Sequence, residues 1–215
     1  MSKQVYVWDR FVRIFHWSLV ALFITSYVSG EEEHWIHSYS GYAIFTLVSL
    51  RIVWGFVGSQ HARFKDFVRS PLTVLGYLKS MVSGSPKRYL GHNPAGGAMI
   101  LGLLATLLLT TLSGMKLYAI EEGKGPFAQQ ISTSVITTAY ASNDEYEAKE
   151  YQSEEYEHEE SEEEEFWEEI HEAAVSLMLL LILLHVIGVV VSSRQHGELL
   201  VKSMITGYKD EDDGK

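Results

Sequence analysis

Four long apolar stretches constrain the fold of this chain more than any other feature. They cover residues 11–30, 36–57, 93–117 and 171–193. A bilayer core of about 30 Å is crossed by a helix of about 20 residues, so each stretch is long enough to span a membrane. Backbone groups inside a bilayer must be hydrogen-bonded within the protein, which favours helices. The sequence therefore predicts an all-α integral membrane four-helix bundle, forming a single domain over residues 1–215.

The connection between the third and fourth stretches is strongly acidic. The chain has a net charge of −11 at pH 7, and residues 121–172 alone carry 18 acidic and two basic residues. Residues 123–169 are rich in Glu, Ser and Tyr, and their charges repel one another. We expect this low-complexity segment to be a long disordered periplasmic loop, either simply solvated or docking a basic partner.

Lysine and arginine residues mark one side of the membrane. They gather in the N-terminal segment, in the connection over residues 58–92 and in the C-terminal tail, whereas the other two connections are acidic. Because positive charge is enriched in cytoplasmic connections, we expect a multi-pass protein with both termini in the cytoplasm. Residues 71–82 have apolar side chains at helical spacing and are predicted to form a helix in the membrane interface.

Four histidines occupy matching depths in these spans. His171 and His185 are 14 residues apart, almost four helical turns, so both point the same way about 21 Å apart along one helix. His16 and His185 lie near the cytoplasmic ends of the first and fourth spans. His37 and His171 lie at the start of the second and fourth spans, on the outer side. Ionisable residues in membrane spans are costly and indicate function. The sequence predicts two pairs, His16 with His185 and His37 with His171.

Each predicted pair suits the iron of a haem. A flat macrocycle held between two imidazoles and apolar walls is the ligation that a helix bundle supplies. Zinc or copper would require three or four converging ligands, and the two levels are too far apart for that. The chain has no cysteine, which excludes covalent haem attachment through a Cys-x-x-Cys-His motif. Gly41 and Gly188, about one turn from a histidine, would leave room for two non-covalent haems.

Other interpretations of single residues stay open. An isolated histidine in an apolar span is often only a packing residue, and His34 competes with His37 as the ligand at the start of the second span. Arg51 lies 14 residues after His37 on the same helix face. It could pair with a propionate of the inner haem, or extend to the cytoplasmic headgroups.

Several segments carry a resemblance to a known family. The chain resembles the prokaryotic cytochrome b561 and Ni/Fe-hydrogenase b-type cytochrome group of membrane dihaem proteins. The resemblance lies in residues 9–17, 37–42, 51–58, 91–97, 185–188 and 199–207, together with His171.

This resemblance implies two b haems, bound by His16 and His185 on the inner side and by His37 and His171 on the outer side. It also implies an electron-transfer subunit of a respiratory chain in the bacterial inner (plasma) membrane, and leaves open whether the subunit has quinone oxidoreductase activity of its own. Electrons would pass between the quinone pool and a redox partner: a c-type cytochrome, a dehydrogenase or a hydrogenase. We expect the quinone near Arg51, His61 and Asn93, and lipid but no nucleic acid as a further partner. The acidic loop departs from the family pattern and favours a positively charged periplasmic partner.

The sequence gives weaker support to two other functions. A divalent-metal-binding protein or transporter could use the acidic loop as a cation trap, but the spans lack the carboxylates that a transported dication needs. A superoxide:quinone oxidoreductase would need a basic funnel on the outer side, where this chain is acidic.

Overall fold

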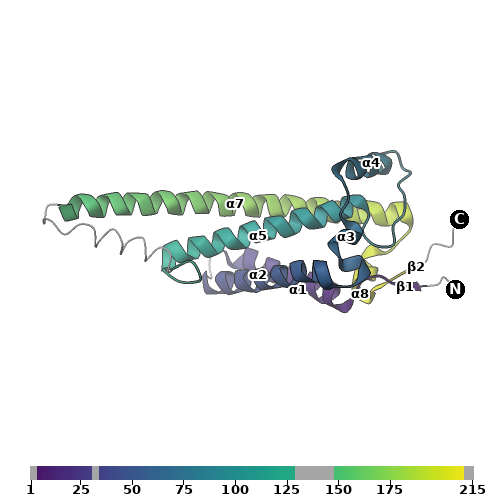
Figure 1. Cartoon of the computed structure of the whole chain (residues 1–215), viewed down its shortest axis with the longest axis horizontal. Helices are drawn as coiled ribbons and strands as arrows, with labels where there is room; N and C mark the ends of the chain where they lie inside the picture. Colours follow the sequence, from purple (N-terminus) through teal and green to yellow (C-terminus); the bar gives the residue numbers. More distant parts are fainter. Residues whose placement is uncertain (1–3, 31–33, 129–147, 211–215) are drawn as a thin grey trace.

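The computed structural model describes residues 4–30, 34–128 and 148–210, and most of this part is helical (Figure 1). Four of its helices are long and apolar enough to cross a membrane. They are α1 (Arg10–Ser29), α2 (His34–Val57), α5 (Pro94–Glu122) and α7 (Ala148–His196). Each of the four predicted spans falls on one of these helices. The prediction of an all-α, multi-pass membrane bundle is confirmed.

Local sequence signals set where the helices begin and end. The Asp9 carboxylate accepts a hydrogen bond from the Val12 amide at 2.8 Å and caps α1. Asn93 caps α5 in the same way, through Gly96 at 2.7 Å, with Pro94 as the first helical residue. Gly123 ends α5 with a φ of +61°, a conformation that glycine adopts at little cost.

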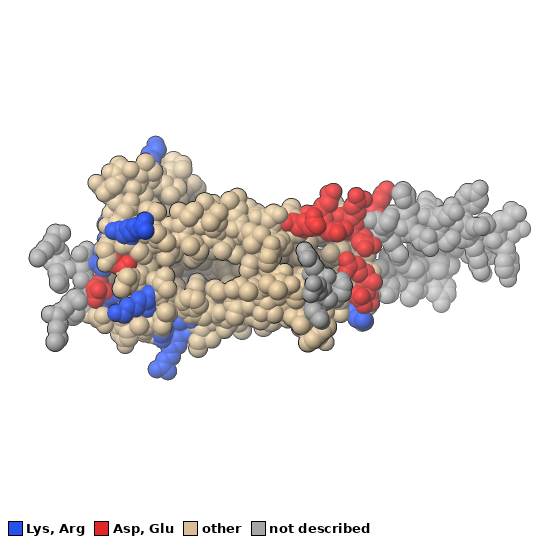
Figure 2. All heavy atoms as spheres, turned by 180° about the vertical axis from the view of Figure 1, so that it is seen from behind, with Lys and Arg blue, Asp and Glu red and all other residues tan. Residues whose placement is uncertain are grey.

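The bundle is assembled from neighbouring helix pairs. α5 packs along α7, α1 along α2, and α2 along α5. The core where they meet is formed by Phe15, Ile44, Val48, Leu104, Leu107 and Met178. Among the described residues, α1 and α7 do not pack along one another in this way. The face seen in Figure 2 is hollowed between its upper and lower helices.

One end of the bundle carries the smaller elements and both chain ends (Figure 1), and we call it the terminal end. Strand β1 (Gln4–Tyr6) pairs antiparallel with β2 (Tyr208–Asp210) there. The remaining elements at this end are η1 (Gln60–Ala62), α3 (Phe64–Phe67), α4 (Pro71–Val82) and α8 (Leu200–Thr206). The helix predicted over residues 71–82 is thus present as α4.

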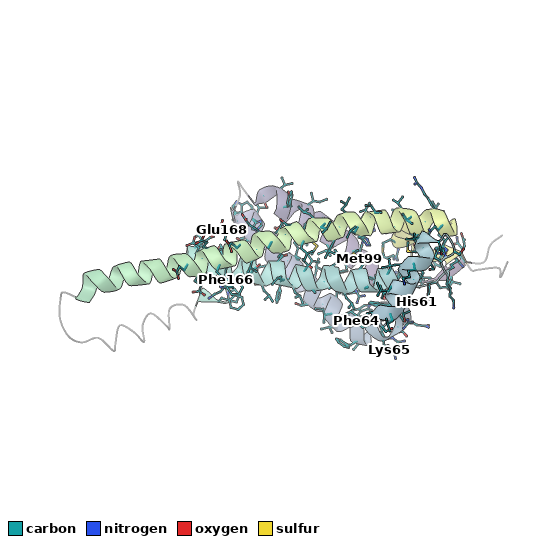
Figure 3. All side chains as sticks on the ribbon, turned by 90° about the horizontal axis from the view of Figure 1, so that it is seen from above. His61, Phe64, Lys65, Met99, Phe166 and Glu168 are labelled. Carbon is teal, nitrogen blue, oxygen red and sulfur yellow. The ribbon has the colours of Figure 1, made fainter. Side chains whose placement is uncertain are left out.

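The opposite end carries acidic side chains, shown in red in Figure 2. Phe166 and Glu168 lie toward this end, whereas His61 lies at the terminal end (Figure 3). α7 begins at Ala148, so residues 148–169 are helical where we expected disorder. Glutamate is a good helix former, and Glu163 pairs with Lys116 of α5 at 2.8 Å, which ties the extended helix to its neighbour. Residues 129–147 of the acidic segment lie outside the described residues.

Candidate cofactor sites

The structure brings the four predicted histidines together as two pairs. The ring centres of His37 on α2 and His171 on α7 are 6.0 Å apart. Those of His16 on α1 and His185 on α7 are 6.5 Å apart. Because the two α7 histidines are separated by nearly four turns, the pairs lie about 21 Å apart along the bundle. These are the pairings that the sequence predicted from depth.

The separation within each pair fits a metal held between two imidazoles. Two metal–nitrogen bonds of about 2 Å each, together with the distance from each nitrogen to its ring centre, put the ring centres about 6 Å apart. In the described part of the chain, no three His, Cys, Asp or Glu residues cluster as ligands for a metal ion. The geometry therefore favours a metal that brings its remaining ligands with it, as the iron of a macrocycle does.

His171 is held in place by one face of α5. Its Nδ1 lies 3.0 Å from the Thr110 carbonyl oxygen and 3.1 Å from the Ser113 hydroxyl. When Nδ1–H donates to that carbonyl, Nε2 is left unprotonated and free to bind a metal. Gly114 of the same helix leaves room for the ring, because a Cβ at this position would come within 2.9 Å of His171. We call this surface of α5, formed by Thr110, Ser113 and Gly114, the seat of His171.

His37 has an equivalent seat on α1. Its Nδ1 lies 2.9 Å from the carbonyl oxygen of Ser26, so it also can donate to a backbone carbonyl and keep Nε2 free. A Cβ on Gly30 would lie 3.5 Å from this ring, which is ordinary contact. His34, the alternative ligand, is the first residue of α2, but the pair with His171 is formed by His37.

The pair formed by His16 and His185 is held differently. Nδ1 of His16 is buried and has no hydrogen-bond partner among the described residues. Its ring packs edge-on against Trp17, with ring centres 5.1 Å apart.

Two glycines, one near each pair, border open space. Gly41 follows His37 by four residues, and Gly188 follows His185 by three. A Cβ on either glycine would meet no atom within 4 Å.

Arg51 is buried, with 3% of its surface exposed. It does not extend to the headgroups, one of the two alternatives that the sequence left open. Its Nη2 donates to the Ala62 carbonyl at 3.1 Å, and the guanidinium lies 5.7 Å from the centre of the Phe64 ring. Its Nη1 is buried without a partner among the described residues. Nη1 is therefore free to donate to an anionic group such as a haem propionate, the other alternative that the sequence left open.

Asp9 is the centre of a polar network that the sequence did not predict. Besides capping α1, its carboxylate accepts hydrogen bonds from the Trp54 indole at 3.0 Å and from the Ser59 hydroxyl. Burial alone raises the pKa of Asp9, but these hydrogen bonds outweigh burial, and the pKa lies below its ordinary value. Asp9 thus ties the start of α1 to the end of α2.

His92 is a second residue whose setting the sequence did not show. It precedes α5 and is half-buried, and its Nδ1 is buried without a hydrogen-bond partner among the described residues. Its ring lies between Trp8 and Phe67, with centres 4.5 and 4.8 Å away. Burial lowers the pKa of His92 to about 3, so the ring is neutral.

Comparison with known proteins agrees with this geometry. The family model described as prokaryotic cytochrome b561 matches residues 7–207. A probable Ni/Fe-hydrogenase B-type cytochrome subunit of Rhizobium leguminosarum bv. viciae is 32% identical over 152 residues, 57% of this chain and 62% of its own length. A protein of the same description from Azotobacter chroococcum mcd 1 is 27% identical over 173 residues, 66% of this chain and 71% of its own.

The match thus spans less than two thirds of the Rhizobium protein. No solved structure matches the chain. The family match covers all four membrane-spanning helices and all four paired histidines. The chain therefore belongs to the prokaryotic cytochrome b561 family.

Proposed function

We propose that this protein is a dihaem b-type cytochrome that conducts electrons through the membrane. The observation that carries the proposal is the presence of two histidine pairs at bis-imidazole spacing, one near each end of the bundle. His16 and His185 would hold the inner haem, and His37 and His171 the outer haem. Haem supplies reversible one-electron chemistry when bound.

The residues of the chain decide how such a group would act. Two imidazoles on one iron leave no open position, so the site favours electron transfer over binding of oxygen. The carbonyls of Ser26 and Thr110 would orient the outer ligands and increase their basicity. Surrounding apolar helices would exclude water from both levels.

The electron partners follow from the relatives and from charge. Because the relatives are named as Ni/Fe-hydrogenase subunits, a hydrogenase is the first candidate donor, with a dehydrogenase or c-type cytochrome as the alternative. The acidic side chains at the outer end would favour a basic docking surface on that partner. Enrichment of Lys and Arg at the terminal end supports placing both termini in the cytoplasm of a bacterial inner membrane.

We place a quinone at the terminal end, near the inner haem. Arg51, His61 and Asn93 lie in or beside the elements gathered there. A quinone carbonyl requires a hydrogen-bond donor, and buried Nη1 of Arg51 is a donor without a protein partner among the described residues.

Reduction of the purified protein by a quinol tests this function. In detergent, we expect dithionite to reduce two b haems per chain and a short-chain quinol to reduce them in a reaction slowed by quinone-site inhibitors. In His185→Ala, quinol reduction should be lost while dithionite still reduces the outer haem. His196→Ala, at the end of the same helix, is the matched control and should behave as wild type. Correctly inserted wild-type protein without haem would overturn the proposal, and reduction unaffected by the inhibitors would overturn its quinone site.

A further inference from the structure

We propose that a hollow at the terminal end, between α1 and α8, binds the phosphate of an anionic phospholipid. The hollow has a volume of about 460 Å³ and opens to the surface. It is lined by Tyr6, Arg10, Arg13, Thr206 and Tyr208. These residues come from β1, α1, α8 and β2, so the hollow exists only because the two chain ends meet.

The charge of the hollow selects an anion. Its lining contains two arginines and no acidic residue. Nη1 of Arg13 donates to the carbonyl of Ile205 in α8, which holds this guanidinium at the side of the hollow. Arg10 lies one turn earlier and is exposed. Guanidinium groups bind phosphate through paired, charge-assisted hydrogen bonds, and an arginine that is already held loses less conformational freedom on binding.

The surface that continues from the hollow selects a lipid over a free phosphate. Arg10, Arg13, Ile14 and Trp17 are spaced as one face of α1. Beyond the arginines this face is apolar, with Ile14 66% and Trp17 42% exposed. The Trp17 indole donates to the Met204 carbonyl of α8 at 3.4 Å, and Ile205 beside it is 59% exposed. A headgroup on the arginines would therefore leave its acyl chain on apolar side chains of the span.

The depth of the hollow in the membrane is consistent with this ligand. It lies at the first turns of α1, where the apolar span begins. Tyrosine and tryptophan are enriched at the headgroup level of membranes. Tyr6 and Tyr208 line the hollow, and Trp17 lies about one turn after Arg13 on α1. Basic residues at a membrane surface attract anionic lipids, which favours an anionic over a zwitterionic headgroup at Arg10 and Arg13.

Native mass spectrometry of the delipidated protein tests the proposal. Phosphatidylglycerol and phosphatidylcholine with the same acyl chains would be added in equal amounts. We expect wild type to retain one phosphatidylglycerol in preference to phosphatidylcholine. Arg10→Gln combined with Arg13→Gln should weaken that retention about tenfold or more, as expected for losing charge-assisted hydrogen bonds. Arg10→Gln alone, which leaves the Arg13–Ile205 bond in place, should give a smaller loss in the same direction.

Lys202→Gln is the matched control. It removes one positive charge from an exposed position of α8 that does not line the hollow, and retention should not change. Equal retention by wild type and the double variant would overturn the proposal. So would displacement of the lipid by millimolar glycerol 3-phosphate or inorganic phosphate, because the site would then bind a free anion. The lipid measurement is independent of haem, whose content should be unchanged in all these variants.

Discussion

Gly114 of α5 lies directly against the ring of His171 on α7. A Cβ at position 114 would approach His171 Cε1 to 2.9 Å, closer than real side chains come without a shift. The same stretch of α5 supplies the Thr110 carbonyl and the Ser113 hydroxyl beside Nδ1 of this ring. One helix face is thus shaped around a single imidazole, as expected for a side chain whose orientation matters more than its packing.

Gly114→Ala should therefore displace His171 and abolish the haem that we propose between His37 and His171. The added methyl group would push the ring off its hydrogen bonds, and a misoriented imidazole binds its metal more weakly by about 10- to 100-fold. Haem per chain, measured as the pyridine haemochrome, should fall from two to one. Gly102→Ala on the same helix is the control, because its Cβ would lie 3.8 Å from Leu181. Two haems in Gly114→Ala would contradict the role given to this glycine.

Asp9→Ala should destabilise the fold at neutral pH. The change removes a helix cap and two hydrogen bonds to a charged acceptor, and we expect a loss of about 2 kcal/mol. Thermal unfolding in detergent measures it. Asp66→Ala, which breaks only the partly exposed pair with Arg63, should cost less than about 1 kcal/mol. Equal losses in the two variants would argue against the network.

The stability that the Asp9 carboxylate contributes to the fold should also depend on pH. Its pKa in the folded protein lies below the ordinary value of 3.8. The charged carboxylate therefore contributes its full stability above pH 3.8 and loses that stability as the pH falls through the lower folded pKa. The difference in unfolding temperature between wild type and Asp9→Ala should narrow in that acid range. A difference that stays constant would mean that the charge contributes nothing.

His92 should make the protein sensitive to acid. Its pKa is about 3 in the folded protein and 6.5 ordinarily, so the unfolded chain binds the extra proton between these values. The contribution of the neutral His92 ring to the free energy of unfolding is fully present above pH 6.5. It falls as the pH drops toward 3, by up to about 1.4 kcal/mol per pH unit. His92→Phe keeps a ring between Trp8 and Phe67 and should flatten this slope. His196→Gln is the control and should keep the wild-type slope. A His92→Phe variant with the same slope would contradict a His92 ring that is neutral in the folded protein.

Much of this architecture could be predicted from local patterns. Hydropathy identified the spans, and a 14-residue spacing with matched depths paired His16 with His185 and His37 with His171. The seat of His171 could not be predicted, because Thr110 and Gly114 come close to it only after α5 packs on α7. The pairing of Asp9 with Trp54 and Ser59, and the packing of His92 between Trp8 and Phe67, likewise depend on contacts between residues far apart in the chain. The helical start of α7 at Ala148 was missed because its charge pattern suggested disorder, although glutamate favours helices.

Haem stoichiometry in paired histidine variants tests the central claim most directly. Wild type and His34→Ala should each bind two b haems, and His37→Ala and His185→Ala one each. The double variant His16→Ala/His185→Ala should still bind one, because both changes fall on the same site. His37→Ala/His185→Ala should bind none. A single haem in wild type, or loss of both haems in His16→Ala/His185→Ala with the protein still correctly inserted, would contradict two independent bis-histidine sites.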